Sequence, residues 1–209
     1  MNMKFRIFHT VFIALCSVFL VSSPKFATAR VILKEKITFY DVTGRTGREI
    51  FKSMVDNGPK LGGRRGHALA TTEYEYDVKN LDVKIENGRC IPSRLDILVQ
   101  VKYTFPKWTP KGSVKSTTRE AWKDFSKSVR WHEEQHVKIA LDYAEDYEKA
   151  LMKTRLRASQ NCDQASFSTV WRATRAALKH NRRQKQFDRR DLRPGGRGYE
   201  AQLRLIKAP

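Results

Sequence analysis

Residues 132–136 read His-Glu-Glu-Gln-His, so two histidines stand four positions apart and a glutamate follows the first. On a helix this spacing places both imidazole rings on one face, one turn apart, where they can share a zinc ion. Glu133 then lies beside the metal and can take a proton from zinc-bound water. The pattern predicts a zinc metalloprotease, a hydrolase in which His132 and His136 bind the metal and Glu133 is catalytic.

Two histidines on a helix can also be structural. Taking ~100° per residue, both rings fall in the middle of the apolar stripe of the surrounding helix. Buried imidazoles without partners are costly, and a shared zinc ion would remove that cost. Hydrogen bonds to backbone carbonyls or tyrosine hydroxyls would also remove it, and the chain offers Tyr74, Tyr76, Tyr103, Tyr143 and Tyr147. Zinc is the preferred interpretation, with Tyr143 as a candidate to stabilise the oxyanion.

A zinc site needs at least one more protein ligand. On the same helix, Asp142 points about 120° away from His136, and Asp146 lies ~15 Å along the axis. The third ligand must therefore come from another segment. Its candidates are His67, His180, Glu73 and Glu75. We prefer His67, which stands in a glycine-rich loop leading into a predicted sheet.

The elements around the pentad are predicted from the period of their apolar residues. Strands are predicted over residues 31–42, 68–78, 81–85 and 95–105, and helices over 46–55 and from Ser113 or Ser116 to about Thr154. Asn87-Gly88 is typical of a hairpin turn. Strands joined by short turns favour an antiparallel sheet with one buried face. The expected fold is α+β, in which a small antiparallel sheet packs on the long pentad-bearing helix in a zincin-like arrangement.

Residues 1–29 have the layout of a secretory signal peptide. Lys4 and Arg6 precede an apolar run over residues 11–21, and Ala27-Thr28-Ala29 is a small-x-small cleavage site. The run is shorter than the ~20 residues of a membrane span, although an uncleaved anchor is the alternative. We expect cleavage after Ala29 and a secreted or periplasmic protein. After the signal peptide we expect a metalloprotease domain over residues 30–170. A basic tail, helical or disordered, would then occupy residues 171–209.

Removal of the signal peptide leaves two cysteines, Cys90 and Cys162. An even pair in an exported protein predicts a disulfide bond. Metal ligation is the alternative, but the chain has no C-x-x-C spacing.

Positive charge is the second unusual property of the chain. It has 41 basic and 22 acidic residues, a formal net charge of +19, and the excess is greatest after Arg172. A helix is predicted from about Phe167 to Arg190, and the residues after Pro194 are expected to be poorly ordered. Such a segment attracts polyanions or anionic membranes. An alternative function is therefore a non-catalytic envelope protein that binds anionic lipid or cell-wall polymer. Nucleic acid is a weaker candidate, since the segment lacks interleaved aromatic residues.

Several spaced motifs resemble a bacterial domain-of-unknown-function family whose members are described as predicted secreted zinc-dependent proteases. The motifs are Tyr40-x-Val42-x-Gly44-x-Thr46, Gly58-Pro59, Cys90, Pro106-x-Trp108, Trp122, His132-Glu133-x-x-His136 and Cys162. The resemblance covers about residues 36–170 and leaves the basic segment outside. It implies an exported bacterial protein that uses zinc to cleave a peptide or protein substrate.

Overall fold

The computed structural model describes residues 28–60, 66–158, 162–163, 166–167 and 175–209. This part of the chain forms four strands and four helices, which confirms the predicted α+β class. In chain order they are β1 (Thr28–Val42), α1 (Gly47–Asn57), β2 (Thr71–Glu86), β3 (Arg89–Trp108), α2 (Ser116–Lys153), β4 (Leu156–Arg157), α4 (Arg175–Asp191) and α5 (Arg197–Lys207).

The sheet is mixed, so the prediction of an antiparallel sheet is only partly right. Its strand order is β1-β3-β2, with β4 paired to β3. The hairpin β2–β3 is antiparallel and turns at Asn87-Gly88, as predicted, but β1 runs parallel to β3. The connection from β1 to β2 contains α1 and is long enough to carry the chain across the sheet. Short turns, on which the antiparallel prediction depended, join only β2 to β3.

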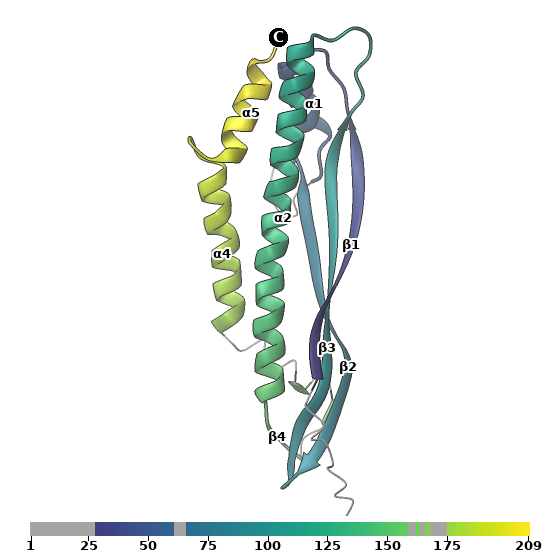
Figure 1. The fold of residues 1–209 in the computed structure, drawn as a ribbon, viewed down its shortest axis with the longest axis vertical. Coiled ribbons are helices and arrows are strands. Elements are labelled where there is room, and N and C mark those ends of the chain that lie inside the picture. The colour runs from purple at the N-terminus through teal and green to yellow at the C-terminus, as the bar shows by residue number, and fades with distance from the viewer. Residues whose placement is uncertain (1–27, 61–65, 159–161, 164–165, 168–174) are drawn as a thin grey trace, which may run out of the picture.

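Helix α2 covers one face of the sheet. In β3, alternate side chains are buried toward the helix: Leu95, Ile97, Val99, Val101, Tyr103 and Phe105. They pack against the apolar stripe of α2, which includes Val137, Ala144 and Leu151. Figure 1 shows three layers, with α2 between the sheet and the pair α4–α5. The stripe predicted from helical periodicity coincides only in part with this face, because the two histidines at its middle, His132 and His136, contact α4.

A second apolar cluster holds the C-terminal helix in place. Val42, Ile50, Met54, Phe125 and Leu205 bring β1, α1, α2 and α5 together, and all five are fully buried. The amide of Gly47, at the start of α1, also donates to the carbonyl of Ala208. Residues 197–207 are thus a packed helix, although the sequence suggested poor order. Their apolar positions are too few to be noticed without the partner surface that α1 and α2 supply.

The predicted disulfide bond is present between Cys90 and Cys162. It joins two residues whose Cα atoms are 5.7 Å apart and that are separated by 72 positions in the sequence. Cys90 lies in β3, so the bond fixes the segment that follows β4 to the end of the sheet.

Residues 1–27, which include most of the predicted signal peptide, lie outside the described residues. Strand β1 begins at Thr28, so cleavage after Ala29 would remove the first two residues of this strand. Among the described helices, none combines the length and the apolar character that crossing a bilayer requires.

Candidate metal centre

Two histidine side chains project from consecutive turns of α2. His132 and His136 are largely buried, and their Nε2 atoms are 3.2 Å apart. Helical geometry explains this, because residues four positions apart face the same side of a helix. The structure therefore brings together the two predicted metal-binding histidines.

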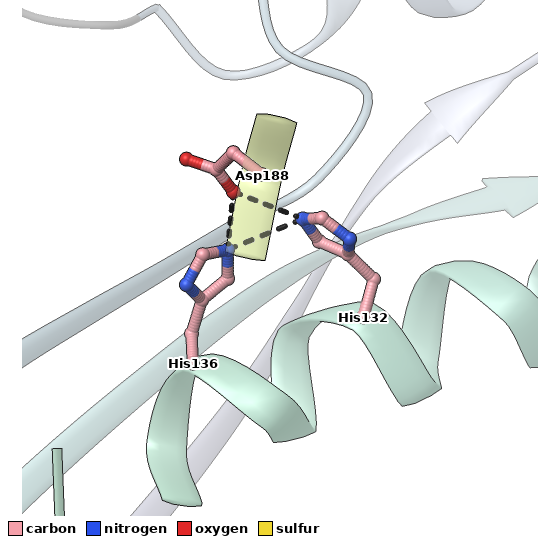
Figure 2. Close-up of side chains that lie close together, drawn as sticks. All are labelled: His132, His136 and Asp188. Carbon is pink, nitrogen blue, oxygen red and sulfur yellow. Dashed lines mark hydrogen bonds and ion pairs between the residues drawn. The ribbon is translucent and has the colours of Figure 1, made fainter. Parts of the chain in front are cut away.

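A carboxylate from another helix completes the cluster. Asp188 extends from α4 toward the two rings, as Figure 2 shows. Its Oδ1 is 3.0 Å from Nε2 of His136 and 3.5 Å from Nε2 of His132. The three atoms form a compact triangle, and each comes from a residue type that binds divalent metals.

The other ring nitrogens are held by a second set of polar side chains. Nδ1 of His132 donates to Oδ2 of Asp191 at 2.7 Å, and Nδ1 of His136 donates to Oε1 of Gln184. Gln184 also donates its amide to the main-chain carbonyl of His136 at 3.0 Å, which orients its oxygen toward the ring. With both Nδ1 atoms protonated, a neutral ring presents its Nε2 lone pair to the cluster.

These contacts explain how a strongly basic helix packs against α2. Four polar residues of α4 contact α2 at helical spacing: His180, Gln184, Asp188 and Asp191. Phe187 adds an apolar contact, because its ring lies 4.8 Å from that of His132 and 5.2 Å from that of His136. The inner face of α4 is thus mostly polar, and the histidines supply its partners.

The carboxylates perturb the ionisation of the rings. Burial lowers the pKa of each histidine, but hydrogen bonds outweigh burial. Asp188 and Asp191 raise the net pKa of His132, and Asp188 and Gln184 raise that of His136. Burial alone would raise the pKa of Asp188, yet its bonds to both rings hold it well below the ordinary range. The cluster therefore favours a positive charge among its three donor atoms.

Glu133 lies in the same cavity as the cluster. It is buried, and its Oε2 accepts a hydrogen bond of 2.7 Å from the hydroxyl of Thr72 in β2. The cavity has a volume of about 650 Å³ and is lined by residues 71–74 of β2, by α2 and by α4. Its size is in the usual range for ligand-binding sites. One carboxylate oxygen of Glu133 is thereby fixed by Thr72.

The three donor atoms fit a tetrahedral zinc ion. Two donors that each lie ~2.1 Å from such an ion are about 3.4 Å apart. The separations of 3.0, 3.2 and 3.5 Å lie close to this value. Donation of Nδ1 to a carboxylate or carbonyl oxygen is also the usual support of a metal-binding histidine. His132, His136 and Asp188 would hold the ion.

The structure places the other candidate ligands elsewhere. His67, the preferred third ligand, is not part of the cluster, and its Nδ1 lies 2.8 Å from the carbonyl of Val55. His180 contacts the hydroxyl of Tyr74 at 3.1 Å, and the Tyr143 ring packs 4.5 Å from the ring of His180. Of the two glutamates, Glu73 pairs with Lys102 at the cavity rim and Glu75 is exposed. Asp142 pairs with Arg183.

Sequence reasoning missed Thr72, Gln184, Asp188 and Asp191. For the last three, a signal was present. Polar residues recur at positions 180, 184, 188 and 191, which is the spacing of one helix face. Asp188 is also the only acid of the predicted basic helix, and Asp191 directly follows its predicted end. Thr72 carried no such signal, because only the packing of β2 on α2 brings it to Glu133.

A comparison of the sequence with protein-family models finds one family that covers most of this fold. A family model described as "Bacterial protein of unknown function (DUF922)" matches residues 37–196. The match continues past residue 170, where the sequence suggested that the resemblance ends, and includes α4 with Asp188 and Asp191. No curated protein and no solved structure matches the chain. With most of its length covered by this model, the chain belongs to the DUF922 family of bacterial proteins.

Proposed function

We propose that the protein is a secreted or periplasmic zinc-dependent metallopeptidase with a zincin-like site. One observation carries the proposal: three metal-binding side chains converge beside a buried glutamate in an open cavity. His132, His136 and Asp188 hold the metal, and Glu133 is the catalytic residue. The third ligand in this proposal is Asp188, in place of His67.

Asp191 and Gln184 support the ligands. They fix both rings by accepting hydrogen bonds from the Nδ1 atoms. A fixed tautomer keeps each Nε2 lone pair directed at the cluster, and such partners usually strengthen metal binding 10- to 100-fold. When bound there, zinc would polarise the scissile carbonyl and the attacking water.

Glu133 moves the proton during hydrolysis. Its carboxylate accepts a proton from the attacking water as the new C–O bond forms, and donates it to the amine as the C–N bond breaks. Thr72 holds one oxygen of Glu133 and leaves the other for this transfer. The single hydrogen bond fixes the direction in which the carboxylate faces.

Strand β2 supplies a place for an extended substrate. It pairs with β3 on one side, and within the described residues no strand pairs with its other edge. Residues 71–74 of this strand line the cavity beside Glu133. A peptide can add to such an edge by main-chain hydrogen bonds, so its backbone would run past the zinc site.

The substitution Glu133→Gln tests the catalytic role, and Glu134→Gln is its matched control, because Glu134 is an exposed neighbour on the same helix. Zinc content of the purified protein and hydrolysis of a peptide library are measured for each. We expect Glu133→Gln to keep its zinc and to lose about 100-fold or more in rate, with Glu134→Gln unchanged. Full hydrolysis by zinc-loaded Glu133→Gln would remove Glu133 from this role. Absence of zinc from the wild type, or equal zinc content in the wild type and a His136→Ala control, would contradict the metal site.

A further inference from the structure

Helix α4 separates its charges between two faces. Its acids, Asp188 and Asp191, are directed toward the histidines of α2. Its exposed side carries Lys179, Arg182, Lys185, Arg189 and Arg190, and the exposed Arg193 stands two residues after its end. The acids of the helix are thus used internally, and the outer side presents positive charge alone.

A continuous basic stripe runs along this outer side. We define the α4 stripe as Arg182, Lys185 and Arg189, which lie at i, i+3 and i+7 and line one shallow hollow with Asn181 and Gln186. All five residues are exposed. The neighbouring Arg183 pairs with Asp142, but within the described residues none of the three members of the stripe forms an ion pair. Their charges are available to an outside partner.

The chemistry of the stripe favours one class of partner. The hollow contains neither an aromatic ring, on which a base or a sugar could stack, nor a carboxylate to accept hydrogen bonds from sugar hydroxyls. The hollow offers a row of cations. It lies on α4, which belongs to the outer layer of the molecule (Figure 1). A flat array of negative charges can contact all three at once.

We propose that the α4 stripe docks the protein on an anionic phospholipid membrane surface. This goes beyond the peptidase proposal and holds whether or not the cavity hydrolyses peptides. The metal cluster lies on the other face of the same helix, so docking leaves the cavity open. A helix with its side chains is about 10–12 Å across, so the cluster would stand roughly that far from the lipid headgroups. Polypeptides close to the membrane surface would then be within its reach.

Truncation before α4 cannot test this proposal, because it would also remove Asp188 and Asp191. The test is a triple substitution, Arg182→Gln, Lys185→Gln and Arg189→Gln, which changes only exposed side chains. The matched control is Arg119→Gln, Lys123→Gln and Lys127→Gln. These three residues form an exposed basic row on α2 that also contains Glu120 and Asp124. Both variants lose the same formal charge.

Binding is measured by co-sedimentation with vesicles of phosphatidylcholine alone and with vesicles in which a third of the lipid is phosphatidylglycerol. The exported protein is used without residues 1–29, so that the N-terminal apolar run does not bind lipid itself. Each basic residue near such a surface contributes about fivefold to affinity. The wild type should bind only the anionic vesicles and release them at high salt. The α4 variant should bind about 100-fold more weakly.

The control variant should stay within a few-fold of the wild type, because acids in its row already oppose the attraction. Equal weakening of the two variants would show that net charge, and not the α4 stripe, determines binding. Failure of the wild type to bind anionic vesicles, or equal binding to both kinds of vesicle, would overturn the proposal. If the wild type binds inorganic polyphosphate but not vesicles, the partner of the stripe is a soluble polyanion and the membrane proposal is wrong. None of these results depends on whether zinc is bound.

Discussion

Asp191 should control how tightly the site binds zinc, although it is not itself a proposed ligand. Only 5% of its surface is exposed, and each of its oxygens accepts one hydrogen bond. Oδ2 accepts from Nδ1 of His132 at 2.7 Å, and Oδ1 accepts from the amide of Gly198 at 3.1 Å. Both partners donate hydrogen bonds. The carboxylate satisfies both of them because each of its two oxygens is an acceptor.

The substitution Asp191→Asn breaks this match with almost no change in shape. Asparagine has one oxygen and one amino group, so one of the two donors would face another donor. A buried donor left without a partner costs about 1–3 kcal/mol. The imidazole of His132 also loses the partner that fixes its orientation. We therefore expect the zinc dissociation constant to rise about 10- to 100-fold.

Competition with a chromophoric zinc chelator measures this constant, and circular dichroism confirms that the variant is folded. Asp142→Asn is the matched control. Asp142 contacts Arg183 of α4 at 2.6 Å, so its loss weakens packing of α4 without changing a hydrogen bond to a histidine. The control should bind zinc as tightly as the wild type. An unchanged constant in folded Asp191→Asn would refute the reasoning, and equal losses in both variants would show that Asp191 acts only by holding α4.

Three further predictions concern stability. Phe125→Ala should destabilise the fold by about 3–5 kcal/mol, measured by urea unfolding, because Phe125 of α2 is fully buried in the cluster that α2 forms with β1, α1 and α5. A loss below 1 kcal/mol would contradict the packing. The pKa of Asp96 is lowered from 3.8 to about 2, first by its hydrogen bond to Arg30. Ionised Asp96 therefore stabilises the fold by roughly 1–2 kcal/mol above pH 4, and this stabilisation is lost as the pH falls toward 2. The free energy of unfolding of Asp96→Asn should accordingly fall less between pH 4 and pH 2 than that of the wild type. Replacement of Cys90 and Cys162 by alanine should cost about 4 kcal/mol for a loop of this length, and an unfolding midpoint equal to that of the wild type would exclude a stabilising role.

Local patterns explain what could be predicted. The long helix and the hairpin at Asn87-Gly88 depend on residues close in sequence, and both are present. His132 and His136 follow from helical spacing alone. Their relation to each other therefore needed no knowledge of the rest of the fold.

The remaining parts of the site depend on contacts between distant segments. Asp191 and His132 are separated by 59 positions, and Thr72 and Glu133 by 61. Asp188 was hidden for another reason, since its helix is so basic that its charge suggested a solvated tail. The spacing of its polar residues on one helix face, and not its total charge, indicates a polar stripe suited to packing on histidines.

The parallel pairing of β1 with β3 determines an order of events during folding. Residue Thr28 pairs with Arg94 and Val42 with Trp108, so every contact of this pair spans more than sixty positions. The β2–β3 hairpin needs only its own turn, and local contacts form faster than distant ones. Strand β1 must therefore wait for β3 to emerge and fold back. Until then the exposed edge of the hairpin can pair with other chains, and chaperones that shield it would raise the yield of folded protein.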